Sequence, residues 1–246
     1  RYLLGNLNDE FKSMDLKELK LKELPELEQY MLHKVYCLNE NFKNYFTNYD
    51  FHNLYKELLN FFFVVLSAFY FDIRKDSLYC DSKNSVIRNN CITVLNIILE
   101  SLIKWIAPIL SFTTEEIFTL INKNKKSIHL EKFIEFPKKF ENKDLNKKWI
   151  ELKKIRDICN ISIEAKRASK EIGSSLEANL IINLNDKLSK ISENIDFAEL
   201  CITSGVEILK NESEEIKVIT EKAQGNKCPI CWKINKNECE RHTIKS

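Results

Sequence analysis

The sequence predicts a mainly α protein: an antiparallel helix bundle, followed by a small α+β subdomain and a cysteine-rich tail. Only four glycines and four prolines occur in 246 residues, and long stretches repeat apolar residues every three or four positions, as helices with one buried face do. Apolar residues make up 44% of the chain, enough for a sizeable core. A glycine-rich nucleotide-binding fold and an all-β fold are therefore disfavoured.

Three long helices are expected in the first half. Pro25 is suited to the first turn of one. Asp50 is a plausible N-cap for a second, which runs to about Lys75 and is apolar nearly all round, so we expect it in the middle of the bundle. The third covers about 83–109, where apolar positions alternate steps of four and three, typical of antiparallel packing.

Shorter elements follow. Thr113 and Glu116 form a capping-box pattern that predicts a fourth, short helix. A loop-rich connection precedes another long helix, which Gly173 is expected to close as the C-terminal cap. The period then changes to two, which predicts strands. The remaining elements are expected at 122–144 (connection), 145–171 (helix), 178–184 (strand), 186–193 (helix), 206–209 and 216–219 (strands).

Two strongly apolar stretches, 58–73 and 91–110, are interpreted as buried helices rather than membrane spans. The first is too short to cross a bilayer and the second carries charged residues. Five cysteines are scattered among apolar neighbours, unlike a secreted disulfide framework, so we expect a reducing compartment, the cytoplasm. The chain begins with Arg1 inside an apparent helix, and we expect it to be a fragment.

The most specific motif is Cys228-Pro-Ile-Cys231 followed by Cys239-Glu-Arg-His242. Three thiolates and one imidazole form a complete tetrahedral ligand set for structural Zn²⁺, which would fold the tail rather than activate water. A redox Cys-x-x-Cys pair is the alternative, but it would not need Cys239 and His242 nearby.

Cations surround an aromatic ring in the same tail: Lys227, Lys233 and Arg241 flank Trp232. An exposed Trp beside cations can stack on an unpaired base while they contact phosphates. The alternative is that Trp232 merely covers the metal site. Residues 122–156 hold twelve Lys or Arg against five Asp or Glu, which is compatible with a phosphate-binding surface or with ordinary solvated lysines.

No catalytic residue is predicted. His33, His52 and His129 lie apart from one another and from any nucleophile, and we interpret each as a packed or surface histidine. A phosphate-cradling glycine loop is also missing from the sequence.

Several segments resemble, in the same order, the anticodon-binding and zinc-binding C-terminal region of bacterial-type isoleucyl-tRNA synthetases, which are class I aminoacyl-tRNA synthetases. Valyl and leucyl relatives share the helical domain but lack the combination of the Gly-Ser-Ser-Leu-Glu-Ala stretch and a terminal zinc knuckle. The segments are Arg1–Leu7, Tyr49–His52, Leu66–Asp72, Lys75–Tyr79, Trp105–Ile117, Ile172–Ala178 and Lys227–Trp232.

The resemblance implies four parts: an anticodon-binding bundle (1–143), a connecting helix (144–175), an α+β subdomain (176–224) and a zinc knuckle (225–246). It implies a part of a ligase that joins isoleucine to tRNA(Ile) using ATP, whose catalytic and editing centres, with ATP and Mg²⁺, lie outside this chain. The expected partners are the tRNA(Ile) anticodon stem-loop and the catalytic domain of the same chain. The protein is expected to be a monomer that does not bind a membrane. Arg1 joins Lys227, Trp232, Lys233 and Arg241 as an expected tRNA contact.

The family usually ends in a second Cys-x-x-Cys, whereas this chain has His242 in place of the last thiolate. Two rivals of other classes stay open. A zinc-stabilised helical adaptor would bind another protein and ignore tRNA even at low salt. A thiol oxidoreductase would form a reversible Cys228–Cys231 disulfide without losing metal.

Overall fold

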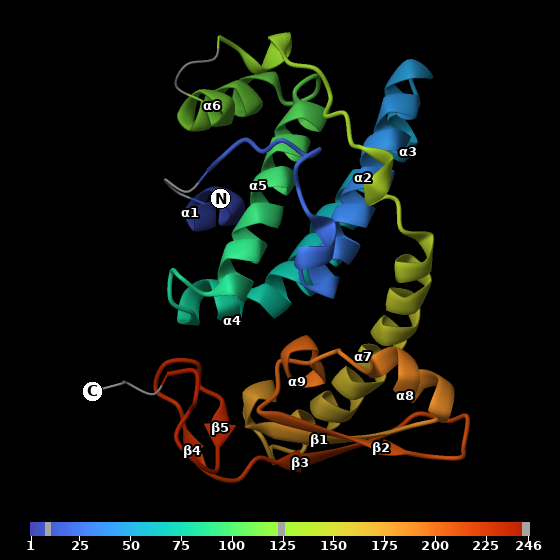
Figure 1. Ribbon diagram of the computed structural model, residues 1–246, viewed down its shortest axis with the longest axis vertical. Coiled ribbons are helices and arrows are strands. Elements are labelled where there is room, and N and C mark those ends of the chain that lie inside the picture. Colours follow the sequence, from blue (N-terminus) through green and yellow to red (C-terminus); the bar gives the residue numbers. More distant parts are fainter. Residues whose placement is uncertain (8–10, 123–125, 243–246) are drawn as a thin grey trace. The chain divides into compact units, whose positions relative to one another are not determined.

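The computed structural model describes residues 1–7, 11–122 and 126–242. The chain forms two compact units, Arg1–Lys143 and Asp144–Ser246 (Figure 1). The first is helical, and the second combines helices with a small sheet, so the predicted mainly α class with a small α+β region is confirmed.

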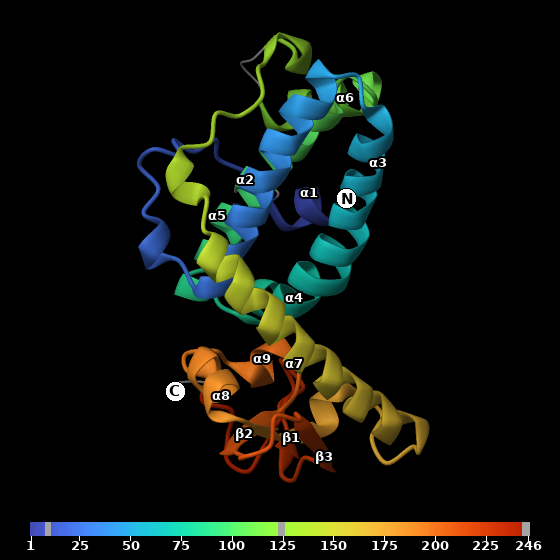
Figure 2. The same ribbon diagram turned by 90° about the vertical axis from the view of Figure 1, so that its right-hand side faces the viewer.

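The first unit is built around three antiparallel helical runs. Figure 2 shows α2 beside both α3 and α5, and α2 packs against each of them. Short turns connect successive runs, which is why they alternate in direction. Its elements are α1 (Tyr2–Leu7), η2 (Leu21–Glu23), α2 (Glu26–Thr47), α3 (Phe51–Asn60), the π-helical η3 (Phe61–Phe71), α4 (Asp72–Cys80), α5 (Val86–Ile106), α6 (Ser111–Ile121), η4 (Ile128–Leu130) and η5 (Lys138–Phe140).

Two of the three long helical runs begin after a residue whose side chain caps the first turn. The side chain of Asp50 accepts a hydrogen bond from the amide of Asn53, as the sequence predicts, and Ser85 does the same for Arg88. The capping box at α6 is wrong, because that helix begins two residues before Thr113, with Leu110 at the N-cap and no side-chain cap. Glu115 rather than Glu116 takes a structural role, accepting from Ser127 Oγ at 2.9 Å.

The run α3–η3–α4 is less buried than the sequence suggests. Phe61, Val65 and Phe69 face the core, but Phe63 is 65% exposed and Val64 51% exposed. By length and composition alone, Phe51–Cys80 and α5 could each cross a membrane. In an apolar 18-residue segment of each helix, 39% is buried for Phe51–Cys80 and 61% for α5. The expectation that the first stretch is too short is therefore wrong, because its helix continues to Cys80, whereas α5 is a core helix as predicted.

A buried ion pair joins α2 to the end of this run. Arg74 donates to both carboxylate oxygens of Glu28, from Nε at 2.6 Å and from Nη2 at 2.7 Å, and the side chains are 3% and 0% exposed. The hydroxyl of Tyr70 donates to Glu28 Oε1 at 3.2 Å. Bidentate geometry with a third donor is what a carboxylate removed from water requires.

The second unit places one long helix beside a three-stranded sheet. The buried residues of α7 recur at helical spacing, from Trp149 through Cys159 to Ile163. The hydroxyls of Ser162 on α7 and Thr220 on β3 lie 2.7 Å apart. The unit's elements are α7 (Lys143–Ala168), η6 (Ser175–Glu177), β1 (Ala178–Leu184), α8 (Asp186–Ser192), α9 (Phe197–Leu200), β2 (Gly205–Lys210), β3 (Lys217–Lys222), β4 (Asn226–Lys227) and β5 (Ile234–Asn235).

The sheet has the order β2-β1-β3, with β1 parallel to β2 and antiparallel to β3. The crossover between the parallel strands carries α8 and α9, and β1 alternates buried and half-buried residues as its period of two predicts. This arrangement brings the end of β3 to the start of the cysteine-rich tail, which begins a few residues later.

The helix α7 ends earlier than predicted. Its last residue is Ala168, and Lys170 takes the left-handed conformation at φ 60°. The amide of Glu171 then donates to the carbonyl of Lys166 at 3.1 Å, which closes the helix end. The expectation that Gly173 caps the helix is therefore wrong; its amide donates to the Glu177 carboxylate instead.

Removing one partner of the buried ion pair should destabilise the chain strongly. In Arg74→Met the Glu28 carboxylate stays buried without its guanidinium, and we expect the free energy of unfolding to fall by about 3 to 5 kcal/mol. Urea denaturation followed by circular dichroism measures the loss. The double variant Glu28→Leu/Arg74→Met is the control and should recover most of it, since no charge is left buried. A loss below about 1 kcal/mol in the single variant would place the pair among weak surface bridges.

Stability should also fall in mild acid because of His33. This side chain is 4% exposed, and its Nδ1 accepts from the amide of Asn142 at 3.0 Å. Burial lowers the pKa of His33 below its usual value. In the unfolded chain His33 binds a proton at about pH 6.5, whereas in the folded chain it does so only at lower pH. The free energy of unfolding is therefore unaffected by this histidine above about pH 6.5 and falls as the pH drops below that value.

Urea midpoints measured between about pH 7.5 and about pH 5.5 test this linkage. We expect a smaller pH dependence in His33→Gln than in the parent chain. The matched control is His52→Gln at an exposed position, which should keep the parent's dependence. Identical pH profiles for all three chains would contradict the role of His33.

Candidate metal centre and nucleic-acid interface

The tail is organised by a short hairpin. Residues Asn226 and Lys227 of β4 pair with Asn235 and Ile234 of β5. Gly225 precedes the hairpin at φ +132°, and a Cβ there would lie 2.1 Å from the Asn235 carbonyl oxygen. Only glycine fits this close approach of two backbones.

The first cysteine pair lies in the turn between the two strands. The amide of Cys228 donates to the Lys233 carbonyl at 2.9 Å, and the amide of Trp232 donates to the Cys228 carbonyl at 3.0 Å. Ser204 anchors the turn to the sheet, because its Oγ accepts from the amide of Ile234 at 2.7 Å. Cys228 and Cys231 are both buried as a result.

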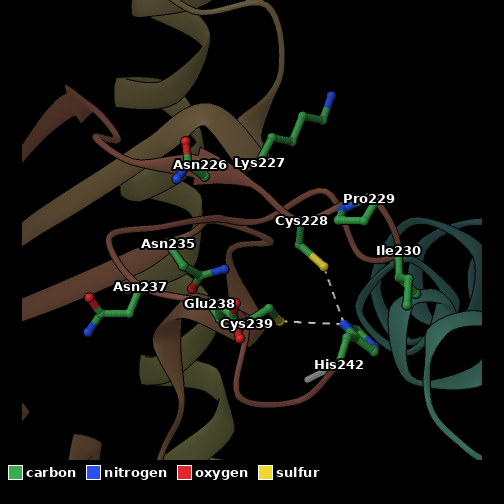
Figure 3. A pocket seen from close by; sticks show the side chains of 10 residues that line it. All are labelled: Asn226, Lys227, Cys228, Pro229, Ile230, Asn235, Asn237, Glu238, Cys239 and His242. Carbon is green, nitrogen blue, oxygen red and sulfur yellow. Dashed lines mark hydrogen bonds between the residues drawn. The ribbon is translucent and has the colours of Figure 1, made fainter. Parts of the chain in front are cut away.

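The second pair closes on the first. The amide of His242 donates to the Cys239 carbonyl at 2.9 Å, which forms a tight turn. His242 Nδ1 lies 3.5 Å from Cys228 Sγ and 3.4 Å from Cys239 Sγ (Figure 3), and Cys231 Sγ lies 3.9 Å from Cys239 Sγ. The four ligand atoms all lie within 4.8 Å of one another.

This cluster fits a tetrahedral zinc ion. Zinc–sulfur and zinc–nitrogen bonds at tetrahedral angles separate two sulfurs by about 3.8 Å and a sulfur from a nitrogen by about 3.6 Å. The three separations above agree with these values within a few tenths of an ångström. Four protein ligands would fill the coordination sphere, so such an ion would stabilise the tail and leave no position for a substrate.

Electrostatics favour a cation at the centre of the cluster. Burial opposes ionisation of Cys228, but hydrogen bonds from the backbone of Cys231 and Ile230 and from neighbouring side chains lower its pKa to about 6. Burial and the adjacent thiols raise the pKa of Cys231 to about 12. The protein alone thus favours the thiolate of Cys228 and opposes that of Cys231, and a divalent cation would offset this opposition.

Trp232 stands on the surface of the same turn. It is 58% exposed and takes the left-handed conformation at φ 64°. The Nζ of Lys227 lies 5.1 Å from the centroid of its ring, within cation–π range. A non-glycine residue in this conformation is strained by about 1 to 2 kcal/mol, so the ring is presented at the expense of stability.

The expected tRNA contacts are only partly brought together. Lys227, Trp232 and Arg241 are exposed and Lys233 is half-buried, all in the tail. Arg1 is exposed in the other compact unit, ahead of α1. His33 is packed, as predicted, while His52 and His129 are surface residues.

Several cations of the basic run serve the fold. Lys139 Nζ donates to the carbonyls of Lys17 and Leu19, and Arg156 Nε donates to the carbonyl of Leu200. Lys147 and Lys154 pair with acidic residues three positions away. Residues 123–125 of the run lie outside the described residues. These contacts favour the interpretation of ordinary structural and solvated lysines.

The sequence did not reveal Gly225 and Ser204 as parts of the site. Gly225 lies three residues before Cys228, and a lone glycine there is a usable signal for a close backbone approach. Ser204 carries no such signal, because its contact joins residues thirty positions apart.

Comparison with known proteins adds two findings. A family model described as the anticodon-binding domain of tRNA ligase matches residues 28–182. The chain is 72% identical over 243 residues to the isoleucine–tRNA ligase of Pelagibacter ubique, which covers 99% of this chain and 27% of that protein. The corresponding ligase of Agrobacterium fabrum is 37% identical over 246 residues, with 95% of this chain and 25% of that protein covered. The chain thus spans about a quarter of the length of these relatives.

Proposed function

The chain belongs to the family of anticodon-binding domains of tRNA ligases, and we propose that it recognises the anticodon stem-loop of tRNA(Ile) as part of an isoleucine–tRNA ligase. The observation that carries the proposal is the 72% identity to an isoleucine–tRNA ligase along 99% of this chain. Activation of isoleucine, with ATP and Mg²⁺, would belong to the rest of the protein, with which this chain would act in one cytoplasmic monomer.

We also propose that Cys228, Cys231, Cys239 and His242 hold a structural zinc ion. The support is the donor set, whose four ligand atoms all lie within 4.8 Å of one another, and its agreement with tetrahedral spacing. Zinc, when bound, supplies ligand bonds that fold a short tail with little apolar core of its own. The protein's part is to fix the four donors, through the β4–β5 hairpin and the Cys239–His242 turn.

Base stacking on Trp232 would follow from this arrangement. Its ring is exposed on a turn held by the Cys228–Lys233 backbone hydrogen bond and by Ser204, so little conformational entropy would be lost on binding. Lys227 beside the ring, with Lys233 and Arg241 on the same tail, would meet phosphates. Arg1 would contribute from the helical unit. The strained backbone of Trp232 supports a selected role for the side chain, since glycine would be easier to accommodate there.

Selective binding of one tRNA tests the proposed function. We expect the zinc-loaded chain to retard tRNA(Ile) in gel-shift titrations at lower protein concentration than tRNA(Val) or tRNA(Met), and the affinity to fall steeply with added salt because lysines and arginines neutralise phosphates. Equal retention of all three tRNAs would overturn the assignment to isoleucine. No retardation even at low salt would overturn RNA binding and favour a protein-binding adaptor.

Substitutions at Trp232 separate stacking from folding. Trp232→Ala should weaken tRNA binding by about 1 to 3 kcal/mol through loss of one stacked base, whereas Trp232→Tyr should retain most of the affinity. Trp232→Gly should bind as weakly as the Ala variant yet unfold at higher urea, because glycine relieves the left-handed strain. The matched control is Ile230→Ala, an apolar side chain 50% exposed on the same turn, with expected affinity unchanged. Full affinity in Trp232→Ala would remove this residue from the interface.

A further inference from the structure

His242 faces the cysteine cluster with one particular ring nitrogen. Figure 3 shows the ring directed at Cys228 and Cys239, and the nitrogen at 3.5 Å and 3.4 Å from their sulfurs is Nδ1. Both values match the sulfur–nitrogen separation of about 3.6 Å expected around tetrahedral zinc. The second nitrogen, Nε2, lies across the ring from the side-chain stem.

The local backbone explains this choice. Cys239 and His242 are three residues apart, and the amide of His242 donates to the Cys239 carbonyl at 2.9 Å, so the turn keeps the two side-chain stems close together. Nδ1 is bonded to Cγ and therefore lies near the backbone, close to the reach of a cysteine sulfur. Nε2 is one bond farther out, and coordination through it would require the backbone to withdraw from the cluster.

We infer that His242 binds the metal through Nδ1 and carries its proton on Nε2, and that this is how a histidine occupies a position otherwise suited to a fourth cysteine. The inference rests on the proposed zinc site and adds the ligating atom. Coordination at Nδ1 fixes the tautomer, because a neutral imidazole that gives one nitrogen to a metal must hold its hydrogen on the other.

Cadmium-113 provides a direct test, since it replaces zinc among thiolate and imidazole ligands and has a nuclear spin. Proton–cadmium correlation spectra of the full 246-residue chain should show His242 coupled through three bonds to Hε1 alone, because Hδ2 is four bonds from a metal on Nδ1. Coupling to both Hε1 and Hδ2 would mean coordination at Nε2 and overturn the inference. Cadmium bound without any histidine coupling would overturn it too.

Two further measurements keep the proposals apart. If the folded chain takes up neither zinc nor cadmium, the proposed zinc site is wrong. Binding of tRNA is measured independently by gel shift.

His33, His52 and His129 serve as internal controls and should show no cadmium coupling. His242→Cys should bind metal at the same one-to-one ratio and lose all imidazole coupling, because a cysteine sulfur has nearly the reach of Nδ1. Loss of metal in that variant would contradict the argument from reach.

Discussion

A carboxylate that has left water needs donors on every side, and Glu28 finds them in the fork of Arg74 and the hydroxyl of Tyr70. The helical unit depends on this contact, because it joins α2 to the run α3–η3–α4. That run is rich in similar apolar side chains, which do not by themselves fix the position of a neighbouring helix. Apolar packing alone would tolerate a helix shifted along its neighbour, whereas a bidentate ion pair accepts one position. Asn39, in the second half of α2, acts similarly: it accepts from Trp105 Nε1 at 2.9 Å and donates to the Ile134 carbonyl at 2.9 Å.

Helices with a clear apolar period could be predicted from the sequence, and those without one could not. The seam of α5 and the N-cap Asp50 follow local rules that hold whatever the rest of the chain does. The π-helical turns of η3 depend on which carbonyl each amide selects among neighbouring residues. The four residues of α9 are too few to carry a period. Lys170 instead of Gly173 closes α7, because a tight turn can override the conformational advantage of glycine.

At the candidate site, the ligand types and their spacing could be read from the sequence, but the supports could not. Four metal-type donors in two short motifs predict a metal centre because few other roles need them together. The hydrogen bond from Ile234 to Ser204 spans thirty residues and follows from the fold alone. The left-handed backbone of Trp232 was equally hidden, since nothing local distinguishes it from an ordinary surface tryptophan.

The presence of His242 in place of a fourth cysteine changes the electrical character of the tail. With zinc bound, three thiolates and a neutral imidazole leave one net negative charge on the centre, whereas four thiolates would leave two. Opposite a polyanion, that difference acts on every phosphate within about 8 Å, the screening length at physiological salt. With zinc bound, the histidine would therefore make the tail less repulsive to nucleic acid than a fourth cysteine would, without adding a cation to it.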